Sequence, residues 1–89
     1  MAKMIVTHGV VDVDRWLKGK TERAEAVTAM GCSNVKDYVA EDGSRSIAIS
    51  ADVQDLDVVK ATLASPSDDL SAAMERHGVV PPLTIYIEK

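Results

Sequence analysis

Four side chains in this sequence have the chemistry to line a small-molecule pocket and to bind or react with its ligand: His8, Trp16, Lys20 and Tyr38. His8 alternates with apolar residues in a strand pattern. An imidazole among apolar neighbours has a pKa that its surroundings tune, so His8 is a candidate general base. The plainer alternative is a hydrogen-bonded histidine in the core or at its rim. We expect catalysis, if the chain performs any, to depend on His8.

The other three residues would shape the pocket rather than react. Lys20 could hold an ammonium over a pocket to meet a carboxylate or an enolate, or bury only its stem and extend its charge to water. Trp16 is either a core anchor or a pocket wall. Tyr38 could supply a phenol to the pocket, or pack its ring and point its hydroxyl outward. We expect Trp16, Lys20 and Tyr38 to bind the substrate.

His77 and Cys32 have simpler interpretations. His77 falls at the end of a helical pattern, where the helix dipole favours a cationic ring. Cys32 is the single cysteine, so it cannot form an internal disulfide, and a small buried apolar side chain is its expected role. The sequence has no His-x-x-x-His pair, phosphate loop, dinucleotide fingerprint or Gly-x-Ser-x-Gly motif. We therefore expect neither a metal nor a cofactor.

Composition excludes several classes of function. The 89 residues carry a net charge of -4, with 46% apolar and 27% charged residues. That length and balance predict one globular domain over residues 1–89. An acidic chain without a basic stripe is a poor nucleic-acid partner. No stretch reaches the roughly 20 apolar residues of a membrane span. The N-terminus enters a strand pattern directly, which predicts a cytoplasmic protein.

Hydrophobic patterning predicts the elements that must position these residues. The first strand spans Lys3 to Val10, and Asp12 can cap a helix that begins near Val13 and stops at Gly31. Its expected inward stripe includes Lys20, beside Gly19. The Asp-Gly pair within Glu41–Ser44 predicts a tight hairpin turn. The two strands that flank this turn are expected at Cys32–Ala40 and Arg45–Ala51.

The second half repeats the helix-then-strand order. Asp55 can cap a helix from Leu56 to about Ala64. A break follows at Ser65-Pro66, with the serine as a cap and the proline at the first helical position of a segment from Pro66 to His77. Pro81-Pro82 should then lead into a last strand at Leu83–Glu88.

This order, β-α-β-β-α-β, predicts an α+β ferredoxin-like fold with an antiparallel sheet. Helices cover one face of such a sheet and leave the other open. Both faces of the first strand are mostly apolar or small, and the strand near Ser46–Ala51 has a face of small residues. An apolar open face needs a partner, so we expect a homodimer formed through it.

The chain resembles the dimeric α/β-barrel superfamily, in particular the small cyclase-like proteins grouped with antibiotic biosynthesis monooxygenase domains. The resemblance lies in Val11-Asp12-Val13-Asp14-Arg15-Trp16, in Ser65-Pro66 followed by Leu70 and Met74, and in Gly78-Val79. It implies two sheets associated face to face, with a pocket under the helices of each subunit. Oxygenases of the group carry Asn, Trp and Tyr in the pocket; Asn34 and Trp16 do not match those places, so that set is not transferred.

Resemblance and residues together give a functional expectation. The leading hypothesis is a cofactor-independent cyclase, isomerase or monooxygenase-like enzyme acting on a small aromatic or polyketide-like molecule. The alternative is a non-catalytic ligand-binding or regulatory module, which the scarcity of aromatic and titratable pocket residues favours.

Overall fold

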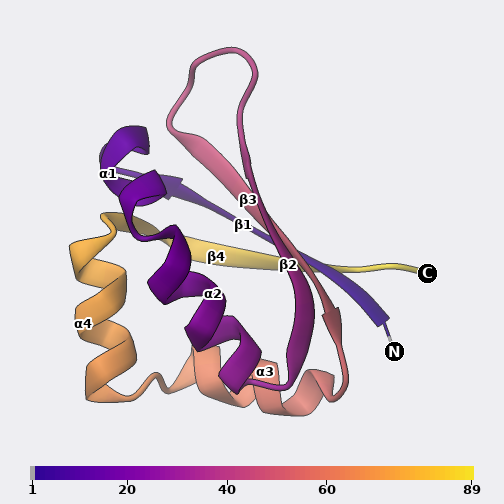
Figure 1. Ribbon diagram of the computed structural model, residues 1–89. Helices are drawn as coiled ribbons and strands as arrows, with labels where there is room; N and C mark the ends of the chain where they lie inside the picture. Colours follow the sequence, from indigo (N-terminus) through magenta and orange to yellow (C-terminus); the bar gives the residue numbers. More distant parts are fainter. Residues whose placement is uncertain (1) are drawn as a thin grey trace.

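The computed structural model describes residues 2–89 and contains one antiparallel sheet of four strands. The strands are β1 (Ala2–Val10), β2 (Cys32–Val39), β3 (Ser46–Val53) and β4 (Val79–Ile87), in the spatial order β2-β3-β1-β4. Helices α1 (Val13–Lys18), α2 (Lys20–Ala29), α3 (Leu56–Ala64) and α4 (Asp68–Arg76) gather on one side of the sheet (Figure 1). The predicted ferredoxin-like α+β fold is therefore confirmed, with each helical region divided in two.

Strand alternation separates the two faces of the sheet. Along β1 the side chains of Met4, Val6, His8 and Val10 are buried, and the pairing of Val6 with Ile49 carries the same face across to β3. The core between sheet and helices is mainly aliphatic. Its buried members include Met4, Val6, Val27, Cys32, Ala51, Val53 and Val59, with a second cluster of Val10, Trp16, Ile47 and Ile49.

The first helical region differs from its prediction. One helix from Val13 was expected, whereas the chain forms a short α1 and a separate α2 with Gly19 between them. Asp12 does cap the start, since its Oδ1 accepts a hydrogen bond from the Arg15 N–H at 3.2 Å. Lys20, the first residue of α2, directly follows the break at Gly19. Lys20 is exposed, and Arg23 is the buried cation of this helix.

The second helical region agrees at α3, whose predicted bounds are those observed, with Asp55 as its cap. The start of α4 was predicted wrongly. Ser67, rather than Ser65, is the cap, because its Oγ accepts from the Leu70 N–H at 3.1 Å. The last strand begins at Val79 and includes both prolines, earlier than predicted. Proline is tolerated there because β4 is an edge strand.

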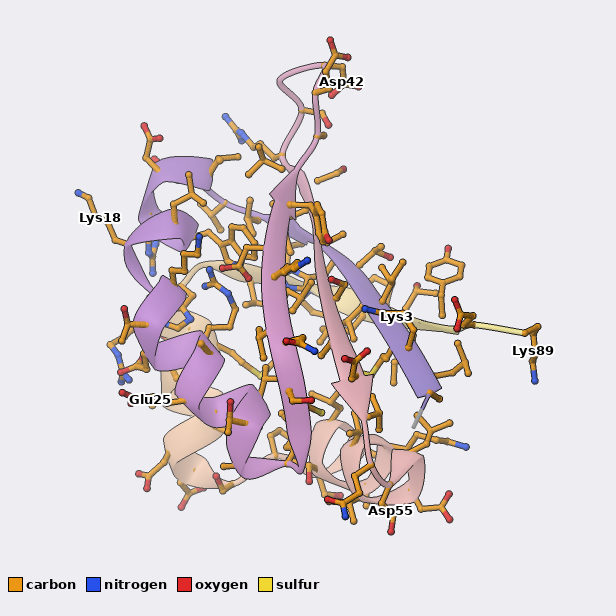
Figure 2. The ribbon with its side chains drawn as sticks, turned by 45° about the vertical axis from the view of Figure 1, so that its right-hand side comes forward. Lys3, Lys18, Glu25, Asp42, Asp55 and Lys89 are labelled. Atoms are coloured by element: carbon orange, nitrogen blue, oxygen red, sulfur yellow. The ribbon has the colours of Figure 1, made fainter. Side chains whose placement is uncertain are left out.

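The other sheet face has no helix over it. Ile5, Tyr38, Val80 and Tyr86 are exposed there, on positions that alternate with the buried ones. The β2–β3 connection extends beyond the helices at the top of Figure 1, and Figure 2 shows Asp42 at its tip. None of the helices in residues 2–89 has the length and apolar character needed to cross a membrane.

Candidate functional site

A cavity of about 80 Å³ lies between the sheet and the helices. Its walls are mostly aliphatic side chains and methionines from β1, β3, α2, α3 and α4, among them Met4, Val6, Met30, Leu63 and Met74. Besides the thiol of Cys32, four polar ionisable side chains interrupt this apolar lining: His8, Glu22, Arg23 and His77. An apolar cavity with a few convergent polar groups is typical of a small-molecule site.

His8 enters the lining from near the C-terminal end of β1. Its Nδ1 lies 2.7 Å from the Gly9 carbonyl oxygen. A carbonyl oxygen only accepts, so Nδ1 carries the hydrogen and Nε2 carries the lone pair of the neutral ring. Burial lowers the pKa of His8 below its ordinary 6.5, opposed by the Gly9 hydrogen bond. Near pH 7 the ring is thus neutral, with Nε2 free of any hydrogen-bond partner among residues 2–89.

Arg23 joins α2 to the sheet beside His8. Its Nε and Nη2 donate to the two carboxylate oxygens of Asp37 on β2, at 3.3 and 3.1 Å, and the two side chains are only 7% and 5% exposed. Its Nη1 donates to the Trp16 carbonyl at 3.0 Å. The guanidinium carbon lies 3.8 Å from the Trp16 ring centroid, a cation–π geometry, and the His8 ring meets the same indole edge to face.

His77 closes the opposite part of the lining, at the end of α4. Its Nε2 lies 3.0 Å from Glu22 Oε1, and Arg76 donates to the same oxygen at 2.8 Å. A carboxylate oxygen accepts, so the neutral His77 ring carries its hydrogen on Nε2, the opposite tautomer to His8. Burial and then the nearby Arg23 charge lower the pKa of His77, against the raising effect of Glu22.

Gly19 explains why this ring fits. A Cβ built at Gly19 would lie 2.3 Å from His77 Nε2 and Cδ2. Only glycine lets the imidazole pack so closely between α1 and α2. The absence of a side chain at Gly19 therefore leaves room for the His77 ring beside the cavity.

The residues predicted from sequence do not all meet. His8 lines the cavity. Trp16 is fully buried beside His8 and Arg23 but does not line it. Lys20 was expected on the inward stripe and is exposed instead, because the helix is broken before it. Tyr38 lies on the open face, where its hydroxyl is 3.1 Å from Ser50 Oγ, because it pairs with Ala48 rather than with an inward residue.

His8 also lines a second hollow of about 350 Å³ on the open face, together with Tyr38. Around His8 the β1–β4 register shifts between Thr7 and Gly9. His8 therefore lies where the β1–β4 ladder is interrupted, and the residue borders both the cavity and this hollow. His8 and Tyr38 are brought together at this outer hollow, not at the inner cavity.

A groove of about 500 Å³ on the outside of the helices adjoins the inner cavity. The two spaces share a wall of five residues from α2 and α4: Glu22, Ala26, Met30, Leu70 and Ala73. Only this layer of side chains separates the cavity from the groove.

Comparison with solved structures shows which proteins share this architecture. An antibiotic biosynthesis monooxygenase superposes with a TM-score of 0.68 at 12% identity, over 100% of this chain and 97% of the other. The chain has the fold of antibiotic biosynthesis monooxygenase-like proteins. Candidate members from Deinococcus radiodurans and Bordetella bronchiseptica give TM-scores of 0.60 and 0.65, each at 16% identity. Those matches cover 100% and 99% of this chain, and 91% and 94% of theirs.

No protein-family model matches the sequence, and comparison with curated proteins finds no match. At such low identities the structural likeness establishes the fold of this chain. The activity must be argued from the cavity itself.

Sequence reasoning did not assign four residues to the site: Gly19, Glu22, Arg23 and Asp37. The signal for Arg23 was present, because Arg23, Val27 and Met30 have the i, i+4, i+7 spacing of one helix face. Because Arg23 is charged, the sequence analysis did not place it on the buried face of the helix. Nothing local identifies Asp37 as its partner, because the two meet only when α2 packs on β2. No three His, Cys, Asp or Glu side chains of residues 2–89 cluster as a metal site requires.

Proposed function

We propose that this protein is a cofactor-independent enzyme that removes a proton from a small, largely apolar molecule held in the inner cavity. His8 is the general base. The observation that carries the proposal is the Nδ1 hydrogen bond to Gly9, which leaves Nε2 unprotonated in an apolar cavity. A base that burial keeps neutral near pH 7 is ready to accept a proton.

The same hydrogen bond supports the second half of the transfer. When Nε2 takes the proton, the ring becomes an imidazolium, and the Gly9 carbonyl stabilises the Nδ1–H that now carries part of the positive charge. Return of the proton to another atom of the substrate gives an isomer. Alternatively, the carbanion left by proton removal attacks a carbonyl carbon of the same molecule and closes a ring, and the carbonyl oxygen then takes the proton back from His8. Such proton transfers are the first step of the isomerase and cyclase chemistry expected from the sequence.

Cavity size bears on the proposed aromatic or polyketide-like substrate. A cavity of roughly 150 Å³ in another protein accommodates benzene, whereas this one measures about 80 Å³. A substrate of a few non-hydrogen atoms fits the cavity as it stands. An aromatic ring requires the unbranched side chains of Met30 and Met74 to rearrange, which methionine does readily.

Hydrogen–deuterium exchange of butanone tests the proposal without knowledge of the natural substrate. In D2O, the α-protons of this small ketone exchange when a base removes them, and proton NMR measures the rate. We expect the wild-type protein to accelerate exchange and His8→Gln to abolish the acceleration, because the amide is not a base. General-base catalysis contributes typically 10²- to 10⁴-fold.

The matched control is Lys18→Gln, since Lys18 extends away from the helical layer in Figure 2. It should exchange butanone like the wild type. No acceleration by the wild type would contradict proton abstraction. Binding of butanone without exchange would favour the alternative, a non-catalytic ligand-binding or regulatory module, which the aliphatic lining also suits.

We also propose that the protein forms a homodimer through its open sheet face in the cytoplasm. Exposed apolar side chains on that face support this assembly, and the small side chain of the half-buried Ala48 permits close approach. The single cysteine, buried and free, suits a reducing compartment.

A charge placed on the open face tests the dimer. Ile5→Lys adds an ammonium at a site that is 39% exposed in one chain. Val58→Lys is the matched control, since Val58 is 45% exposed but lies on α3. Light scattering over a dilution series should give a dimer for the wild type and Val58→Lys, and a monomer for Ile5→Lys. A monomeric wild type would contradict the proposal.

A further inference from the structure

Arg23 has more N–H donors than the structure gives it acceptors. A guanidinium has five N–H groups, and the structure assigns acceptors to three of them, two on Asp37 and one on Trp16. One N–H on Nη1 and one on Nη2 have no acceptor among residues 2–89. Arg23 is 7% exposed and lines the cavity. A buried cation with spare donors is costly unless something supplies an acceptor.

The neighbouring Trp16 repeats the pattern. Its Nε1–H is buried without any hydrogen-bond partner in residues 2–89. The indole lies against both Arg23 and His8. Donors thus outnumber acceptors around this end of the cavity, and of the unmatched donors only those of Arg23 belong to a residue in its lining.

We propose that Arg23 binds an oxygen atom of the substrate, so that the site takes small, mostly apolar molecules with one carbonyl group. This inference rests on the proposed function and adds the substrate class and a second catalytic residue. His8 and Arg23 flank the same indole and line the same cavity. When the carbonyl oxygen of the substrate binds the Arg23 guanidinium, His8 can remove a proton from the carbon next to the carbonyl group.

The chemical step balances without any further reagent. The α C–H bond of the ketone breaks, and its proton passes to His8 Nε2. The bonding electron pair forms the C=C bond of an enolate, and the negative charge develops on the oxygen that Arg23 holds. A preorganised buried donor aimed at a developing oxyanion stabilises the transition state more than the ground state. Return of the proton restores the neutral ring.

Asp37 sets how strongly Arg23 acts. The two-point ion pair with Asp37 fixes the plane of the guanidinium and balances its charge before the enolate forms. A purely structural Arg23 would join α2 to β2 in the same way. The two roles differ in one measurable property: only the proposed one makes the cavity prefer a ketone over a hydrocarbon of the same shape.

Two probes test this preference directly in the wild-type protein. Butanone and 2-methyl-1-butene have the same shape, and the second replaces the carbonyl oxygen with a CH2 group. Three of the four methionines line the cavity: Met4, Met30 and Met74. Titration of protein with ¹³C-labelled methionine methyl groups therefore reports binding inside the cavity. We expect the ketone to bind about 10- to 100-fold more tightly, as for a hydrogen bond to a charged group.

Variants assign the preference to Arg23. Arg23→Met should abolish it, and Arg23→Lys, which keeps a charge near Asp37, should retain part of it. Arg45→Met is the matched control, because Arg45 is an exposed arginine in the β2–β3 connection. Circular dichroism establishes that each variant is folded. If Arg23→Met does not fold, the two-probe comparison in the wild type and Arg23→Lys still decides.

The outcomes separate this inference from the proposed function. The role of Arg23 would be overturned if the two probes bound equally tightly, or if neither probe bound. This holds whatever the rate of butanone hydrogen–deuterium exchange. A preference for the ketone that survives in Arg23→Met would also overturn it. A preference lost in Arg23→Met but without butanone exchange would support Arg23 as the carbonyl-binding residue and remove His8 as the base.

Discussion

Replacing Gly19 by alanine should destabilise this protein, against the usual trend. Alanine is the better helix residue, and Gly19 has an ordinary φ of −87° that alanine adopts freely. On backbone grounds the exchange would stabilise the fold by about 0.5 to 1 kcal/mol. The new Cβ, however, would lie 2.3 Å from two atoms of the His77 ring and 2.8 Å from a third.

The magnitude follows from what the ring must do. The His77 ring atoms have to move to at least 3.0 Å from the new Cβ. The contact between His77 Nε2 and Glu22 Oε1 at 3.0 Å restricts this movement. Overpacking of this kind costs about 1 to 3 kcal/mol. The net effect of Gly19→Ala should be a loss of about 1 kcal/mol, within a range of about 0 to 2.5 kcal/mol. Each kcal/mol lost should lower the Tm by about 4 to 8 °C for a domain of this size.

A double-mutant cycle in urea measures this coupling. His77→Ala removes the obstructing ring, so Gly19→Ala should be stabilising in that background and destabilising in the wild type. The change of sign is the signature of the steric contact. Gly19→Ala that stabilises both backgrounds equally would refute the placement of His77 against Gly19.

Three further predictions concern other buried groups. The folded pKa values of His8 and His77 are lowered, so the free energy of unfolding should be constant above about pH 6.5 and fall as pH drops below it, in urea titrations. Burial raises the pKa of the Cys32 thiol, so native protein should react with a thiol reagent far more slowly than unfolded protein. Asp37→Ala should cost about 3 to 5 kcal/mol, because it leaves Arg23 charged and unpaired.

Each of these has a control and a contrary result. The double variant His8→Gln/His77→Gln should flatten the pH profile, and an unchanged slope would contradict the buried neutral rings. Equal native and unfolded thiol rates would contradict a buried Cys32. Lys3→Met is the control for Asp37→Ala, because it removes a half-exposed partner of Asp52. It should lower the free energy of unfolding by only about 0 to 1 kcal/mol. An equally small loss for Asp37→Ala would contradict the buried ion pair.

Local chemistry accounts for what the sequence predicted well. Helix caps depend on one side chain and the next few N–H groups, which is why Asp12 and Asp55 were identified correctly. Alternation along β1 placed His8 on the buried face for the same reason. The order of these elements then left few topologies, and the ferredoxin-like fold was among them.

Long-range contacts account for what was missed. A single helical period carried through Gly19 puts Lys20 inside, but the helix is broken at Gly19, where His77 from 58 residues later packs, and Lys20 is exposed while Arg23 is buried. The partner of Arg23 lies on β2, beyond the reach of any helix pattern. Tyr38 was assigned to the pocket although β-pairing with Ala48 puts it on the open face.

The most direct test of the central claim is the ¹⁵N NMR spectrum of the two histidine rings. At about pH 7.5, where both rings are neutral, His8 should show a protonated Nδ1 and a bare Nε2, and His77 the reverse. Addition of butanone should shift the bare His8 nitrogen. A protonated Nε2 on His8 at that pH would contradict the account, because the ring would then have no lone pair to take a proton from a substrate.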